Sequence, residues 1–128
     1  MKTYTATVSA YLASKNDRVR PARNHPGMFS TNQYKSSLEA LCLYFRKAAA
    51  EQGWETWPGK FSARIEVWVS NRKDGHNTLT VIMDALQRAG VISNDRNMVY
   101  HGMASHPAPG GVETVQIKLK TLEASCTQ

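Results

Sequence analysis

Acidic residues are scarce in this sequence, and aspartate is the scarcer of the two. The 128 residues contain ten Asp and Glu against sixteen Lys and Arg, which gives a formal net charge of +6. A chain this basic favours a polyanionic partner, and nucleic acid is the commonest one. Net charge is also compatible with a basic protein that has no nucleic-acid role, so the positions of the charges matter more than their sum.

Cysteine and long apolar runs are lacking as well. Cys42 and Cys126 have no metal-ligand spacing, so we expect two reduced thiols in a cytoplasmic protein. No apolar run approaches the roughly 20 residues that span a bilayer. The first residues, MKTYTATVSAYLAS, alternate polar and apolar side chains, which argues against a signal peptide. We therefore expect no membrane association.

Hydrophobic periodicity predicts an α+β fold with the element order β-α-β-α-β-β. Alternation at Phe61, Ala63, Ile65, Val67 and Val69 predicts a strand, and a helical stripe at Leu79, Ile82, Met83 and Leu86 predicts a helix from about Asn77 to Ala89. The other expected elements are strands over 3–12, 99–103 and 115–119, a polar loop over 14–27, a helix from about 31 to 53, and a hairpin turn at HPAPGG. We expect one domain over residues 1–120, with two helices packed on a mixed sheet, and a polar tail over 121–128.

Basic residues concentrate in two places. Arg18, Arg20 and Arg23 lie in the expected polar loop, and Arg72 and Lys73 stand directly before an aspartate. A solvated loop would explain the first group. Contact with DNA phosphates would explain both groups. The basic side chains would then offset the repulsion between the nearby acidic residues and a phosphodiester.

Three of the four aspartates, Asp74, Asp84 and Asp95, fall within 22 residues. His76 and Asp84 are eight residues apart, which places them on one helix stripe if the helix reaches back to His76. A strand end, a helix face and the following loop can converge on one divalent metal ion. The alternative is that Asp74 caps a helix, Asp84 is solvated and Asp95 belongs to a turn.

The same region resembles the signature of the RusA family of Holliday-junction resolvases, found in bacteria and their phages. The resemblance runs through RKDGHN, VIMDAL and RAGVISND, and extends to FSTNQYKSSLEAL and APGGVETVQIKL. It implies a homodimeric α+β nuclease that binds four-way DNA junctions and cuts them with Mg²⁺. Asp74 matches the first acid of the family motif, Asp84 the helix aspartate, and Asp95 the second acid of a loop pair.

Three positions depart from the family pattern. His76 replaces the second aspartate of the motif, Thr80 the catalytic lysine, and Asn94 the first acid of the loop pair. We expect Asp74, His76, Asp84 and Asp95 to hold the metal, with Lys73 or Arg72 supplying the missing positive charge. Imidazole suits Mg²⁺ poorly and Mn²⁺ better.

The sequence thus predicts a divalent-metal-dependent endonuclease that resolves four-way junctions in DNA recombination or repair. A RusA-like protein that binds branched DNA without cutting it is the alternative, because each departure removes a charge that the chemistry would use.

Overall fold

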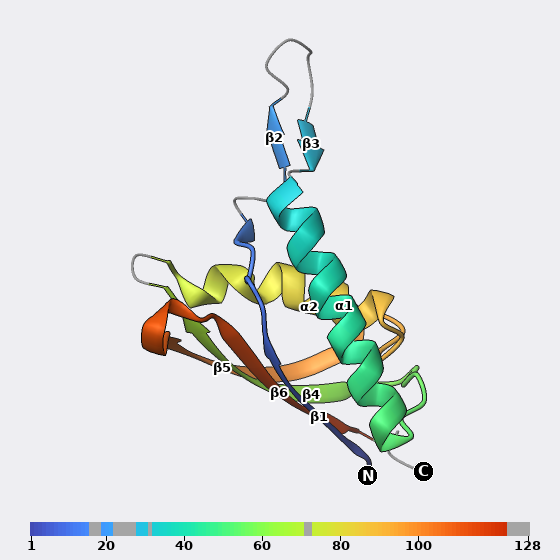
Figure 1. Ribbon diagram of the computed structural model, residues 1–128. Coiled ribbons are helices and arrows are strands. Elements are labelled where there is room, and N and C mark those ends of the chain that lie inside the picture. Colours follow the sequence, from blue (N-terminus) through green and yellow to red (C-terminus); the bar gives the residue numbers. More distant parts are fainter. Residues whose placement is uncertain (16–18, 22–27, 31, 71–72, 123–128) are drawn as a thin grey trace.

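A four-stranded sheet carries two helices on one of its faces (Figure 1). The computed structural model describes residues 1–15, 19–21, 28–30, 32–70 and 73–122. The sheet contains β1 (Thr3–Ser9), β4 (Phe61–Val69), β5 (Met98–Pro107) and β6 (Thr114–Thr121), and the helices are α1 (Asn32–Gln52) and α2 (Leu79–Arg88). The predicted α+β class, with two helices on a mixed sheet, is confirmed.

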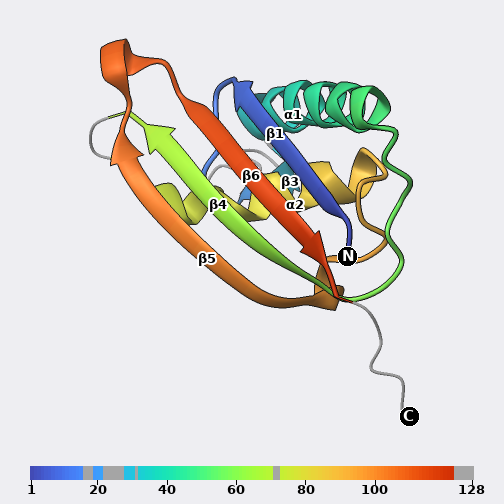
Figure 2. The ribbon, with the colours of Figure 1, turned by 90° about the horizontal axis from the view of Figure 1, so that it is seen from below.

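The strands lie in the order β1-β6-β4-β5. β6 pairs antiparallel with both β1 and β4, whereas β4 and β5 run parallel. Parallel neighbours require a crossover, and the chain makes it through α2. Figure 2 shows the sheet from below, with both helices behind it and β5 at one edge.

Alternation along the strands explains which face is buried. The inward residues of β4, from Phe61 to Val69, are at most 3% exposed, and Val115, Ile117 and Leu119 of β6 are fully buried. Tyr4, in β1, sends its hydroxyl to the carbonyl of Phe45 in α1, at 2.9 Å. Burial against α1 raises the pKa of Tyr4 well above its ordinary value. The alternation predicted at 61–69 and 115–119 is therefore confirmed.

The helix α1 buries the stripe expected from its sequence. Tyr34, Leu38, Leu41, Phe45 and Ala49 are all buried, at a spacing of three or four residues. The helix ends where Gly53 adopts a left-handed φ of 64°, a conformation that glycine accepts without steric cost. Neither helix in the described part of the chain is long and apolar enough to cross a membrane.

The second helix begins later than expected. A 3₁₀ turn, η2 (Gly75–Thr78), precedes α2, which starts at Leu79 rather than Asn77. Ile82, Met83 and Leu86 are buried as predicted, together with Val81 and Ala85. His76 lies in the 3₁₀ turn, so the predicted stripe of His76 with Asp84 on one helix is wrong. Asp74 accounts for the tighter turn, because its side chain caps η2 at this point.

Two other features differ from the expectation. Within the expected loop, residues Val19–Pro21 form β2, which pairs antiparallel with β3 (Met28–Ser30) beyond the N-terminal end of α1 (Figure 1). The segment HPAPGG is not a hairpin turn, because β5 continues through Pro107 and β4 lies between β5 and β6. A 3₁₀ turn, η4 (Pro109–Gly111), leads across that gap. The expected short strand over 99–103 is thus a ten-residue edge strand.

The expected tail boundary falls at the end of β6. Thr121 is still part of β6 and its backbone N–H donates to the carbonyl of Lys2, and Leu122 donates to the carbonyl of Lys60. The remaining tail residues, 123–128, lie outside the described residues.

Close packing at Gly75 fixes η2 against the sheet and gives a first prediction. A Cβ at this position would lie 2.7 Å from both Ser105 Cβ and Val67 Cγ2, and closer still to Ser105 Oγ. Gly75→Ala should therefore lower the free energy of unfolding by about 1–3 kcal/mol, because β4 and β5 must shift. Urea titration followed by circular dichroism measures the change.

The matched control is Gly102→Ala, in β5. Its Cβ would meet nothing nearer than the Tyr100 hydroxyl at 3.6 Å. We expect that variant to stay within about 0.5 kcal/mol of the original protein. Equal stability of the two variants would mean that η2 does not pack on β5.

Candidate functional site

Asp74 and His76 form an exposed pair at the end of β4. The Asp74 carboxylate caps η2, where Oδ1 accepts a hydrogen bond from the His76 backbone N–H at 3.0 Å. His76 Nδ1 lies 3.5 Å from the same oxygen, and both side chains are about 60% exposed. A carboxylate and an imidazole therefore face solvent together, where an ion or a phosphate can reach them.

Asp84 has a different environment. It lies in the middle of α2 and accepts a hydrogen bond from the hydroxyl of Tyr34, a buried residue of α1. The carboxylate thus links the two helices. It is half-buried and turned toward α1.

Asp95 lies at the far end of α2. It begins the 3₁₀ turn η3 (Asp95–Asn97), and its backbone N–H donates to Gln87 Oε1 at 3.1 Å. Asn94 caps this turn through a hydrogen bond from the Arg96 N–H at 2.9 Å. The side chain of Asp95 is exposed, so it too is open to a ligand.

The parallel crossover keeps Asp74 and Asp95 apart. Gly75 lies against Ser105 near the end of β5, whereas η3 directly precedes Met98 at its beginning. Seven residues of extended strand separate those levels, about 23 Å. Figure 1 shows the two turns at opposite ends of α2.

Within one chain the described structure thus does not bring the three aspartates together, and their binding of one metal ion stays a prediction. No group of three His, Cys, Asp or Glu among the described residues could hold a metal ion. The sequence showed that strand end, helix and loop follow one another, but not that α2 carries the chain back along the whole length of the sheet.

Lys73 is held inside the protein. Its Nζ donates to Leu12 O at 2.6 Å and to the two carboxylate oxygens of Glu113 at 2.9 and 3.1 Å. The ammonium also lies 4.0 Å from the ring centre of Tyr11. These three acceptors use all three donors of the ammonium group. The catalytic and DNA-contacting roles predicted for Lys73 would require breaking this arrangement.

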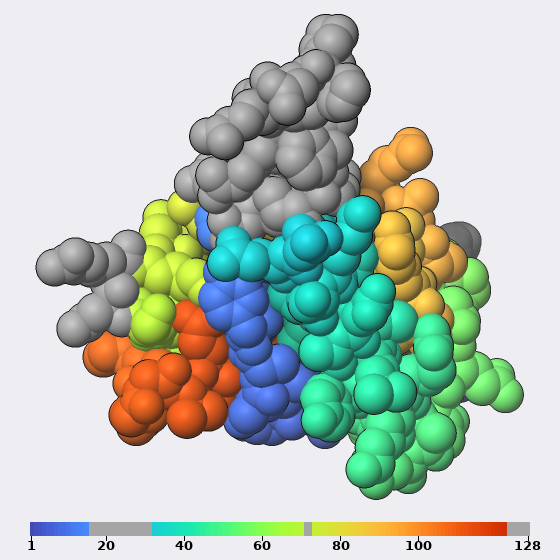
Figure 3. Space-filling model, turned by 45° about the horizontal axis from the view of Figure 1, so that its top comes forward, coloured from blue at the N-terminus to red at the C-terminus, as the bar shows by residue number. Residues whose placement is uncertain are grey.

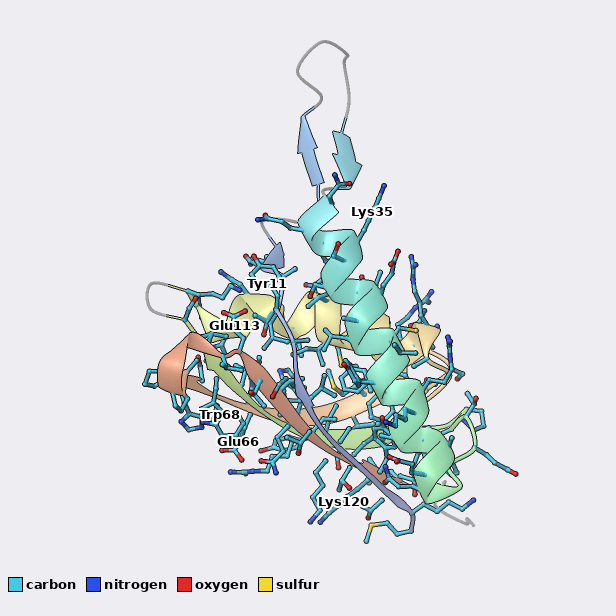
Figure 4. The ribbon with its side chains drawn as sticks, in the orientation of Figure 1. Tyr11, Lys35, Glu66, Trp68, Glu113 and Lys120 are labelled. Carbon is cyan, nitrogen blue, oxygen red and sulfur yellow. The ribbon has the colours of Figure 1, made fainter. Side chains whose placement is uncertain are left out.

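Glu113 is the residue that the sequence reasoning missed. Only 7% exposed, it also accepts hydrogen bonds from the backbone N–H groups of Leu12 and Ser70. Burial acts to raise its pKa, but the hydrogen bond from Lys73, those from Ser70 and Leu12, and the positive charge of Lys73 together hold the pKa below its ordinary value. Figure 4 labels Glu113 and Tyr11, where the ends of β1 and β4 meet the start of β6.

A signal for Glu113 was present in the sequence. It stands two residues before Val115 and continues the inward alternation of β6. A carboxylate at a core-facing strand position requires a buried partner, and Lys73 is the cation that ends up there.

The predicted DNA-contacting arginines lie largely outside this description. Arg18, Arg23 and Arg72 fall outside the described residues, and Arg20 is described only in its backbone, where it pairs with Phe29. Their contact with phosphates stays a prediction.

Comparison with known proteins leaves the RusA resemblance unsupported. No protein-family model matches the chain, and no curated protein matches it. Function must therefore be inferred from the residues and their arrangement.

The Lys73–Glu113 pair predicts a large loss of stability when one partner is removed. Lys73→Met should lower the free energy of unfolding by about 3–5 kcal/mol at pH 7, because a buried carboxylate loses its counter-charge. Chemical denaturation at several pH values measures this. The exposed Lys47→Met on α1 is the control and should change stability by less than about 0.5 kcal/mol.

The effect should depend on pH in one direction. Since the pKa of Glu113 is lower in the folded than in the unfolded state, its carboxylate stabilises the protein above the unfolded pKa. That contribution is lost as the pH falls through the folded pKa, so the difference between the original protein and Lys73→Met should shrink in acid. Equal effects of Lys73→Met and Lys47→Met would instead leave Lys73 free for DNA.

Proposed function

We propose that the protein is a RusA-like endonuclease of branched DNA that acts as a homodimer. The observation that carries this proposal is the exposure of Asp74 with His76 at one end of the sheet and of Asp95 at the other. Neither group makes a metal site alone. Two copies related by a two-fold axis can combine them into two identical sites, and a symmetric junction offers two strands to cut.

An open strand edge supports the dimer. Among the described strands, β5 pairs only with β4, so the backbone groups along its outer edge face solvent. Its sequence, MVYHGMASHP, contains no Lys, Arg, Asp or Glu that would discourage pairing with another strand. Val99 and Tyr100 are 60% and 68% exposed on it. An edge of this length and composition favours pairing with a second strand.

Antiparallel pairing of two β5 strands would bring the right residues together. It sets the beginning of one β5 beside the end of the other, so the partner's Asp95 approaches Asp74 and His76. The two-fold axis repeats this arrangement at the other end. The turn η2 precedes α2 and η3 follows it, and α2 lies on the helix-covered face of the sheet. The two halves of each proposed site therefore lie on that face.

The donor set fits a divalent ion. Two carboxylates and one neutral imidazole suit Mn²⁺, whereas Mg²⁺ prefers oxygen ligands throughout. Such an ion, when bound, would activate water and stabilise the leaving oxygen of the phosphodiester. The Asp74 carboxylate accepts a hydrogen bond from the backbone N–H of His76, so the two ligands are oriented together. Asp84, hydrogen-bonded to Tyr34, contributes by fixing α2 on α1 rather than by binding the ion.

Subunit mixing tests this proposal. Asp74→Asn and Asp95→Asn, each alone, should abolish cleavage of a four-way junction in Mn²⁺. A mixture of the two variants, unfolded and refolded together, should recover roughly a quarter of the original activity, because half of the dimers are mixed and each keeps one intact site.

A mixture as inactive as its components would contradict the shared site. If each site were formed by one chain alone, every site in the mixture would carry one of the two substitutions and no activity would return. Refolding each variant alone controls for recovery caused by refolding itself. Sedimentation at micromolar concentration checks that both variants remain dimers.

Binding without cutting is the second candidate, favoured by Thr80 and Asn94. A threonine cannot supply the charge of the lysine that the family pattern has there, and an amide is a weaker metal ligand than a carboxylate. The combined change His76→Asp with Thr80→Lys rebuilds the pattern and should raise Mg²⁺-dependent cleavage at least about tenfold, a gain typical of one restored catalytic charge. Junction cleavage in Mg²⁺ and Mn²⁺ measures it.

The original protein decides between the two candidates. If it binds the junction but cuts nothing in either metal, while the rebuilt variant cuts, the binding role is correct. If neither the original protein nor the rebuilt variant binds a junction, both candidates are wrong. Where only the rebuilt variant cuts, the subunit-mixing test is carried out in that variant.

A further inference from the structure

The sheet face opposite the helices is uncovered by any described element. Figure 2 looks onto this face, and Figure 4 shows Lys120 and Glu66 pointing away from the helices. Strand pairing sets its outward residues in rows across the sheet. One row holds Lys118 between Thr5 and Arg64, and the next holds Lys120 between Thr3 and Ser62. The face therefore has a definite charge pattern.

At one end of this face, the acidic side chain has a partner on the same face. His106 Nε2 lies 3.1 Å from Glu66 Oε1, and the imidazole stacks on Trp68 with ring centres 5.2 Å apart. The only acidic side chain that the described strands present on this face is thus already paired.

The other end concentrates cations that have no counter-charge among the described residues. Arg64 stands directly opposite Lys118, and Lys120 is two residues along the same strand. All three are exposed, and none of their side chains makes a hydrogen bond or ion pair with another described residue. They line a cavity of about 190 Å³ together with Tyr100 and Gly102. Like charges directly opposite each other on neighbouring strands destabilise a sheet, so an anion bound here would stabilise it.

The cavity also carries an aromatic ring. Tyr100 is 68% exposed and pairs in register with Ser62, beside the cations. Gly102 leaves the space beneath the Tyr100 hydroxyl open, because the nearest atom to a Cβ there is that hydroxyl, at 3.6 Å. Cations that track a phosphate backbone, beside an exposed ring on which a base can stack, are the features that bind single nucleic-acid strands.

We infer that this basic pocket, formed by Arg64, Lys118, Lys120 and Tyr100, binds backbone phosphates of a DNA strand, with a base against Tyr100. The choice of DNA as the source of the phosphate rests on the proposed function, but the pocket does not depend on cleavage. It lies toward the start of β5, the end of the sheet at which Asp95 is found.

A salt-dependence measurement tests the pocket against a matched surface. Lys118→Gln with Lys120→Gln removes two charges from it, and Lys35→Gln with Lys47→Gln removes two from exposed positions of α1. Figure 3 shows α1 on a different face of the molecule, beside β1. Fluorescence anisotropy with a labelled single strand and a labelled four-way junction gives Kd at several salt concentrations.

The pocket variant should lower the slope of log Kd against log salt by about one to two and weaken binding about tenfold or more near 0.1 M salt. The α1 variant should change Kd by less than about threefold, since distant charges are screened there. Tyr100→Leu should weaken single-strand binding without changing the slope. Melting curves should show that every variant is folded.

Equal losses in the two double variants would overturn the inference, because net charge alone would then explain binding. Conversion of the pocket variant to a monomer in sedimentation would also overturn it, since the face would then be an interface between copies. A changed slope with no cleavage by any variant would leave the pocket standing and reject the nuclease.

Discussion

The parallel pairing of β4 with β5 is the constraint on which the other features depend. Parallel neighbours force the chain to travel back along the sheet, and α2 makes that return. The same return buries the apolar stripe of α2, sets the exposed Asp74–His76 pair at one end, and leaves Asp95 at the other. Among the described strands, β4 is the only neighbour of β5. The separation of Asp74 from Asp95, on which the proposed dimer rests, therefore follows from this parallel crossover.

Two kinds of charge are distributed differently on this scaffold. The Lys73–Glu113 pair is largely buried and joins the ends of β1 and β4 to the start of β6, so it fixes the strand ends next to η2. The cations of the open face, by contrast, have no partner among the described residues and stand opposite one another. A buried pair of opposite charges is satisfied by the fold. Exposed like charges on one face repel one another, and a bound anion would offset that repulsion.

Periodicity in the sequence was sufficient for the long elements, because nine alternating residues in β4 and five buried apolar positions in α1 leave little ambiguity. It failed for β2 and β3, because three residues are too few to show a period. It also failed for HPAPGG, whose turn-forming residues belong to the end of β5 and to η4. The site was harder, because nearness in sequence predicted nearness in space for Asp74 and Asp95 and the crossover separates them. Glu113 could have been found, since it lies on the inward alternation of β6.

The separation of Asp74 from Asp95 within one chain is the central claim, and a distance measurement tests it most directly. Spin labels on His76→Cys and Arg96→Cys, with Cys42 and Cys126 replaced by Ser, can be measured by pulsed electron resonance after dilution into unlabelled protein. The strand length between the two turns predicts one intrachain distance of about 20–30 Å, allowing for the label arms. A distance below about 15 Å in the diluted sample would place both turns in one site within one chain, and would contradict the parallel crossover and the shared site together.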